Sequence, residues 1–84
     1  MSSMRENEVR IVDILVEIMK ARGLAVPTLA PDTNLEELGL ESLDFAEAVI
    51  RLEEITGKDP FATGAEYNIK TLSDLANLYD ERVG

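Results

Sequence analysis

The chain is short and strongly acidic. It has 84 residues, of which 45% are hydrophobic, and its 17 acidic and 8 basic residues give a formal net charge of −9. This length suffices for a single domain over residues 1–84, and the apolar fraction argues for a packed core rather than disorder. The charge disfavours binding to nucleic acid or to an anionic membrane and favours a partner with a basic surface.

The sequence lacks both cysteine and histidine. It therefore offers no disulfide, no thiolate nucleophile and no Cys-based metal site, and it lacks the usual general base near neutral pH. The alternation of Asp32, Asn34 and Glu36 does not make a calcium loop, because Glu37 stands where the EF-hand requires glycine. We expect no catalysis and no bound metal.

No apolar run in the sequence approaches the roughly 20 residues of a membrane span. The N-terminus also lacks the apolar core of a signal peptide. We therefore expect a cytoplasmic protein, and a monomer.

The first helix is predicted over residues 4–22. Ser3 and Glu6 have the spacing of a capping box, which satisfies backbone N–H groups at a helix start. Gly23 suits the position just after the last turn. Apolar residues at helical spacing are expected to face the core, and they are Ile11, Ile14, Leu15, Ile18 and Met19.

A long connection follows over residues 24–41. Thr33 and Glu36 again have capping-box spacing, and Leu35 and Leu38 are expected to anchor one short turn. A loop of this length is uncommon in so small a domain unless it has a function.

The second main helix is expected to begin at Ser42 or Leu43 and to run to Thr56, with Gly57 closing it. Its core-facing residues at helical spacing are Phe45, Ala48, Val49 and Leu52.

The last main helix is predicted over residues 72–83, and residues 62–68 suit one weak helical turn. Thr71 and Asp74 fit the N-terminus of the last helix. No run alternates clearly enough to predict a strand. We therefore predict an all-α fold, a small four-helix bundle of three main helices and one short helix, with a long loop between the first two helices. The apolar face of the last helix comprises Leu72, Leu75, Ala76, Leu78 and Tyr79.

Ser42 lies where the long loop meets the second helix. Serine is a favoured N-cap residue, and capping alone accounts for most serines at helix starts. Alternatively, the helix N-terminus presents the hydroxyl where unpaired N–H groups and the helix dipole favour an attached phosphate. The residues alone leave both interpretations open.

Acidic residues recur along the second helix. When successive residues of the helix are placed 100° apart, four charged residues fall in one stripe along it. They are Asp44, Glu47, Arg51 and Glu54. Leu43 and Ile50 lie at the edge of this stripe. They are either the rim of the core or the apolar part of a docking surface that the neighbouring acids complete.

The segment 38–44, with the sequence LGLESLD, resembles the signature of acyl carrier proteins around their modified serine. The likeness continues through residues 49–57, VIRLEEITG, and resumes at residues 69–75, IKTLSDL. Upstream, residues 32–38, DTNLEEL, also fit. The resemblance covers roughly residues 9–80, in the order that the family has.

The resemblance implies that Ser42 receives a 4′-phosphopantetheine arm from coenzyme A, attached by a separate, magnesium-dependent phosphopantetheinyl transferase. The thiol of the arm then holds acyl groups as thioesters for fatty acid, polyketide or related biosynthesis. Val49 and Ile69 match positions beside an acyl cavity. The transferase and the acyl-processing or acyl-activating enzymes are expected to dock, through basic patches, on Glu41, Leu43, Asp44, Glu47, Ile50, Glu53 and Glu54.

The sequence departs from the family pattern in three places. The family usually has aspartate before the serine, where this chain has Glu41. The segment 59–67 is less acidic than in fatty-acid carriers, and Arg51 interrupts the acidic stripe. These departures leave room for a specialised pathway. Two alternatives stay open, a peptidyl or aryl carrier protein and an unmodified acidic adaptor in which Ser42 is only a cap.

Overall fold

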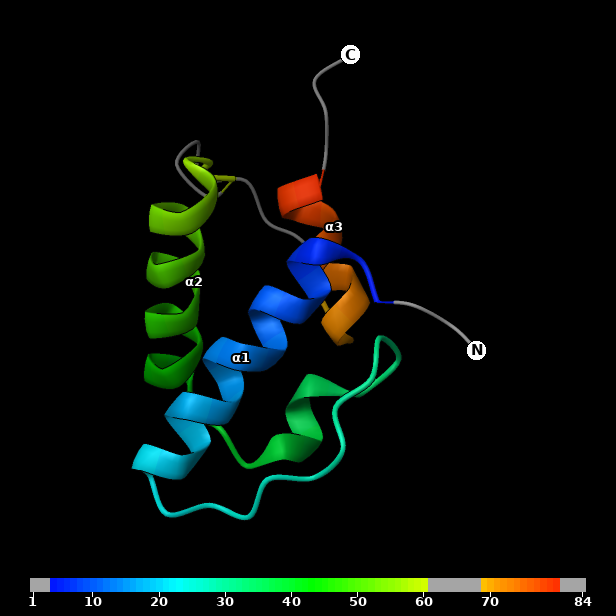
Figure 1. Cartoon of the computed structure of the whole chain (residues 1–84). Helices are drawn as coiled ribbons and strands as arrows, with labels where there is room; N and C mark the ends of the chain where they lie inside the picture. Colours follow the sequence, from blue (N-terminus) through cyan, green and yellow to red (C-terminus); the bar gives the residue numbers. More distant parts are fainter. Residues whose placement is uncertain (1–3, 61–68, 81–84) are drawn as a thin grey trace.

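The computed structural model describes residues 4–60 and 69–80 of the chain (Figure 1). Those residues contain no strand, although Asn34 and Thr71 form an isolated antiparallel bridge. The predicted all-α class is confirmed, while the expected short turn at 62–68 and the end of the last helix lie outside the described residues. In chain order the elements are α1 (Glu6–Ala21), the 3-10 helix η1 (Leu35–Leu38), α2 (Ser42–Thr56) and α3 (Leu72–Asp80).

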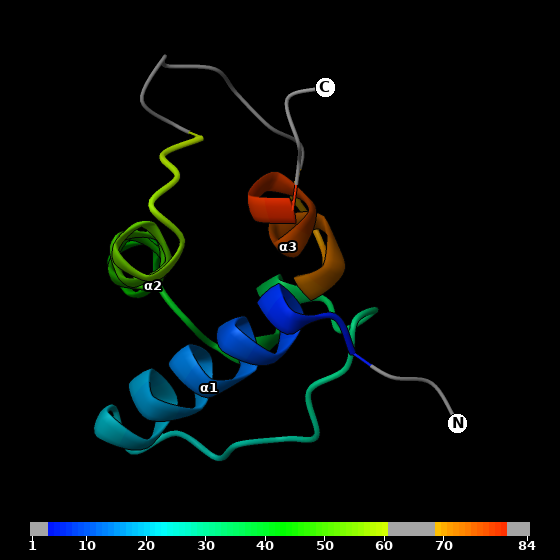
Figure 2. The ribbon, with the colours of Figure 1, turned by 45° about the horizontal axis from the view of Figure 1, so that its top comes forward.

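α1 packs against both of the other long helices. Figure 2 views α2 nearly end-on and shows α2 and α3 on the same side of α1. The apolar face predicted for α1 is confirmed, since all five of its residues are buried. The core that joins the helices consists of Ile11, Ile14, Leu15, Ile18, Met19, Leu35, Leu38, Ala48, Leu52, Leu72, Leu75, Ala76 and Tyr79.

The start of α1 differs from the prediction, whereas the glycine after its last turn is as predicted. The helix begins at Glu6, and the Glu8 carboxylate accepts the backbone N–H of Arg5 at 2.7 Å. The predicted start at residue 4 is therefore wrong, because Glu8 caps the helix two residues later. At the other end Gly23 adopts a φ of +75°, as expected. The backbone N–H groups of Gly23 and Leu24 bond back to the last turn of α1, which closes it.

The long connection is tied to α3. The backbone N–H of Leu35 donates to Lys70 O at 2.9 Å, and that of Leu72 donates to Thr33 O at 3.0 Å. η1 forms with Leu35 and Leu38 buried, as predicted. Its cap is Asn34, whose side chain accepts the Glu36 N–H, and not Thr33, because the Thr33 hydroxyl accepts a bond from within the loop. These bonds set the loop beside the first turn of α3.

Candidate functional site

Ser42 is the first residue of α2 and its side chain is exposed. The N-cap residue is Glu41, with an extended backbone at φ −99° and ψ 168°. Within the described part of the chain, the Ser42 hydroxyl has no hydrogen-bond partner. The interpretation of Ser42 as the helix cap is therefore wrong, because the helix starts one residue too early for that role.

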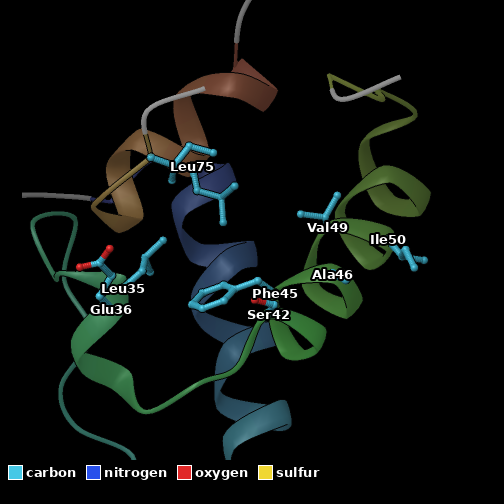
Figure 3. Close-up of a pocket in the computed structure, with 9 residues that line it drawn as sticks. Leu35, Glu36, Ser42, Phe45, Ala46, Val49, Ile50 and Leu75 are labelled. Carbon is cyan, nitrogen blue, oxygen red and sulfur yellow. The ribbon is translucent and has the colours of Figure 1, made fainter. Parts of the chain in front are cut away.

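A pocket of about 510 Å³ opens beside Ser42 (Figure 3). Val49 and Ile69, predicted to lie beside an acyl cavity, both belong to its wall. In Figure 3, Val49 extends from α2 toward the side of α3, whereas Ile50 points away. The described lining is apolar except for the polar side chains of Glu36 and Ser42, and it comprises Leu35, Glu36, Ser42, Phe45, Ala46, Val49, Ile50, Ile69 and Leu75.

Asp44 departs from its predicted place on an exposed acidic stripe. It is 5% exposed, and both of its carboxylate oxygens bond to the guanidinium of Arg22, at 2.9 and 2.7 Å. Oδ2 also accepts the backbone N–H of Glu41 at 2.9 Å. The helical wheel misplaced Asp44 because the cation that makes its burial tolerable comes from another helix. Sequence reasoning missed Arg22 altogether, since a partner at a separation of 22 residues leaves no periodic signal.

Four other predicted docking residues do share a solvent-facing side of α2, which we call the outer face: Leu43, Glu47, Ile50 and Glu54. Two of them are large apolar side chains, with Leu43 78% exposed and Ile50 55% exposed. Exposed apolar residues rimmed by charge are typical of interaction surfaces. The outer face thus has the composition expected of a docking surface.

The charged neighbours of the outer face are partly neutralised. Arg51 donates to Glu47 at 2.7 Å and to Glu17 on α1 at 2.8 Å. Glu53 is half-buried, and a hydrogen bond with Asp59 raises the pKa of its carboxyl. Glu53 therefore does not join the outer face. The Glu41 side chain is 70% exposed and reaches Arg22 at 3.5 Å.

The described residues also show what the chain does not present. No helix among them is long and apolar enough to cross a membrane. Over residues 4–60 and 69–80, no three acidic, histidine or cysteine side chains are grouped as metal ligands would be.

Comparison with known proteins decides what kind of domain this is. A family model described as a phosphopantetheine attachment site matches residues 9–79. The chain belongs to this family. No curated protein matches the sequence. One similar solved structure is that of MacpD, an acyl carrier protein from Pseudomonas fluorescens involved in mupirocin biosynthesis. The TM-score between the two structures is 0.77, and the sequences are 31% identical. The match covers 92% of this chain and 70% of that chain.

The domain therefore has the acyl carrier protein fold, and its family is one of carriers rather than catalysts. Acyl carrier proteins of this family bear covalent 4′-phosphopantetheine. The site has what such a group requires, an exposed hydroxyl at a helix N-terminus, where N–H groups favour a phosphate, beside an apolar pocket. When bound, the group supplies a thiol, and the carrier has no cysteine of its own.

Proposed function

We propose that the chain is an acyl carrier protein that holds acyl groups as thioesters on a 4′-phosphopantetheine arm attached to Ser42. One observation supports the site most strongly. The Ser42 hydroxyl is exposed at the first residue of α2, is not used in capping, and lines the apolar pocket.

Attachment of the arm needs a base that accepts the proton of the Ser42 hydroxyl. The Ser42 Oγ bonds to the phosphorus that carries pantetheine, the bond from that phosphorus to the rest of coenzyme A breaks, and the hydroxyl proton must be accepted. The chain has no histidine, and Arg22 occupies both oxygens of Asp44. We infer that a phosphopantetheinyl transferase supplies the base. The N-terminus of α2 then stabilises the negative charge of the new phosphodiester.

The pocket is proposed to shelter the acyl chain. Its volume of about 510 Å³ lies within the range of roughly 300–1,000 Å³ that is common for small-molecule pockets. Each buried methylene contributes about 0.8 kcal/mol. An octanoyl thioester should therefore shift the methyl NMR signals of Val49 and Ile69 more than an acetyl thioester does. Ile55, which is exposed elsewhere on α2, is the control. Equal shifts with both cargoes would place the acyl chain outside the pocket.

The outer face is proposed as the docking surface for the transferase and for acyl-processing or acyl-activating enzymes with basic patches. Its apolar residues provide contact area, and Glu47 and Glu54 provide charge that steers encounter. Asp44 and Glu53 do not belong to this surface, because Asp44 is buried and bonded to Arg22, and Glu53 is paired with Asp59.

For the pathway, we infer a specialised one such as polyketide biosynthesis rather than general fatty acid synthesis. Two features support this choice. Arg51 interrupts the acidic stripe of α2, and the similar carrier MacpD is involved in mupirocin biosynthesis. A cytoplasmic monomer is part of the same proposal. The cargo loaded in cell extract, identified by mass spectrometry, separates an acyl carrier from a peptidyl or aryl carrier.

The attachment site is tested by intact mass. The protein is incubated with coenzyme A, magnesium and a phosphopantetheinyl transferase of broad specificity. We expect wild type to gain the mass of one phosphopantetheine, and Ser42→Ala to gain none. Ser73→Ala is the matched control, because Ser73 lies in the first turn of α3 as Ser42 lies in that of α2. An unmodified wild type, or a modified Ser42→Ala, would refute the proposal.

A further inference from the structure

The side of α2 that faces the hydrophobic core includes one carboxylate, that of Asp44. The buried residues on this side recur every four positions and are Asp44, Ala48 and Leu52. Ala48 and Leu52 pack in the core, as this spacing predicts. Asp44 continues the same face at the N-terminal end of the helix and is 5% exposed. A carboxylate so buried needs partners that replace its hydration.

Arg22 supplies that replacement from the C-terminal cap of α1. A single guanidinium nitrogen, Nη1, donates to both carboxylate oxygens of Asp44, and Oδ2 also accepts the backbone N–H of Glu41. Charge-assisted bonds of this kind are shorter and stronger than neutral ones. Through Asp44, the end of α1 is therefore joined to the first turn of α2, across the whole length of the long loop.

The first turn of α2 has few other attachments to the molecule. Ser42 and Leu43 are exposed, and Phe45 is half-buried, where it lines the pocket and packs against the core. Asp44 is the one residue of this turn that is fully buried. Because Ser42 precedes Asp44 by two residues on the same turn, the ion pair of Asp44 and the packing of Phe45 are the side-chain contacts that hold the Ser42 hydroxyl in place.

We propose that Arg22 is a positioning residue for attachment of the phosphopantetheine arm, because it holds Asp44 and thereby fixes the turn that presents Ser42. This role rests on the proposed function and adds a residue to it. The outer face of α2 takes no part in the ion pair. Loss of Arg22 should therefore misplace the hydroxyl and leave the docking residues beyond the first turn, Glu47, Ile50 and Glu54, in place. A displacement of about 1 Å can slow a positioned reaction as much as a hundredfold.

The effect of Arg22 on the first turn is measured on the unmodified protein. In Arg22→Gln we expect the Glu41 amide, which bonds to Asp44, to exchange its hydrogen faster than in wild type, with exchange at Leu52 unchanged. Arg10→Gln is the matched control, since both arginines lie at α1 and their side chains are similarly exposed, 34% for Arg10 and 39% for Arg22. Glu41 exchange that stays as slow in Arg22→Gln as in wild type would overturn the inference.

The consequence for transfer is measured with the phosphopantetheinyl transferase, at a temperature where circular dichroism shows every variant folded. We expect Arg22→Gln to lower kcat by roughly tenfold or more with KM for the carrier unchanged, and Arg10→Gln to match wild type. Arg22→Lys should recover part of kcat, because one ammonium can still donate to Asp44.

Two kinetic results would contradict a positioning role. Equal kcat for Arg22→Gln and Arg10→Gln would mean that Ser42 is presented without Arg22. A raised KM at constant kcat would make Arg22 a docking residue instead. A wild type that accepts no arm would refute the proposed function, whereas the exchange experiment would still report whether Arg22 holds the turn.

Discussion

The first turns of α2 and α3 contain similar residues, but their hydroxyl groups have different roles. At α3 the Thr71 hydroxyl accepts the backbone N–H of Asp74 at 3.1 Å, and the Asp74 carboxylate accepts the N–H of Thr71 at 3.1 Å. At α2 the Asp44 carboxylate likewise accepts the N–H of Glu41. The hydroxyl residue, however, is Ser42, which stands one position later, inside the helix.

A shift of one residue therefore separates a hydroxyl that caps a helix, that of Thr71, from one that is exposed at a helix start, that of Ser42. An N-cap hydroxyl is bound to the backbone of its own helix, as Thr71 is. The hydroxyl of Ser42, at the first helical position, faces solvent and the pocket. In α2 the N–H that such a hydroxyl would accept, that of Asp44, donates instead to the backbone carbonyl of Glu41 at 2.9 Å, while the Asp44 carboxylate is paired with Arg22.

The largest expected effect is a difference in stability between variants of the two carboxylates, Asp44 in α2 and Asp74 in α3. Asp44→Ala should lower the free energy of unfolding by about 2–3 kcal/mol, because it removes a cap and the charge-assisted hydrogen bonds from Arg22. Asp74→Ala should cost less, because Asp74 has no such ion pair within the described residues. Urea denaturation at pH 7 measures both. Equal losses would mean that the Arg22–Asp44 pair adds nothing to stability.

The next effect is a difference between variants of the two hydroxyl residues, Thr71 and Ser42, in stability and in attachment of the arm. Thr71→Ala should cost about 1 kcal/mol of stability, as loss of an N-cap does, while the arm is still attached. Ser42→Ala should change stability by less than about 0.5 kcal/mol, as is usual at exposed positions, and should abolish attachment. Each variant is tested by urea denaturation and by intact mass. A Ser42→Ala variant as destabilised as Thr71→Ala would show that the serine is a cap after all.

A smaller effect is expected from the outer face of α2, next to its first turn. Glu47→Lys should slow attachment of the arm more than Asp13→Lys on α1 does, by roughly threefold to tenfold at low salt, because charge close to the docking site steers encounter. Added salt should reduce the difference, since it screens exposed charges. Initial rates of modification provide the measurement. Equal slowing by both variants would indicate that only the total charge matters.

The smallest expected effect is a dependence of stability on pH that arises from Asp74 in α3. Hydrogen bonds from the backbone N–H groups of Lys70 and Thr71 lower the pKa of Asp74 below its ordinary value. The carboxylate thus stabilises the fold above about pH 4, and this contribution is lost as pH falls through the lowered pKa. The stability difference between wild type and Asp74→Asn should therefore narrow from pH 7 to pH 3. Urea midpoints that keep a constant separation would contradict the assignment.

Local features of the fold could be predicted from the sequence. The apolar face of α1, the glycine at its end, the span of α2 and the start of α3 were all correct, because each depends on periodicity or capping within a few residues. No local pattern pointed to Val49 and Ile69. The resemblance to acyl carrier proteins implied that they lie beside an acyl cavity, and both line the pocket, while its role as an acyl cavity stays a proposal.

Features that depend on distant partners could not be predicted in this way. The wheel placed Asp44 in solvent because it considers one helix alone, and only the fold brings Arg22 to it. Two caps were assigned to the wrong residue for a related reason. Asn34 and Glu8 compete with the predicted Thr33 and Glu6, and the backbone path of the folded chain decides between them.

The central claim is that the hydroxyl of Ser42, and no other, carries the arm. Digestion with trypsin of the protein isolated from its own cells should release the peptide 23–51, in which Ser42 is the single serine. Fragment-ion mass spectrometry of that peptide is predicted to place one phosphopantetheine on Ser42. Finding the peptide wholly unmodified, or finding the group on Thr28 or Thr33, would contradict the account.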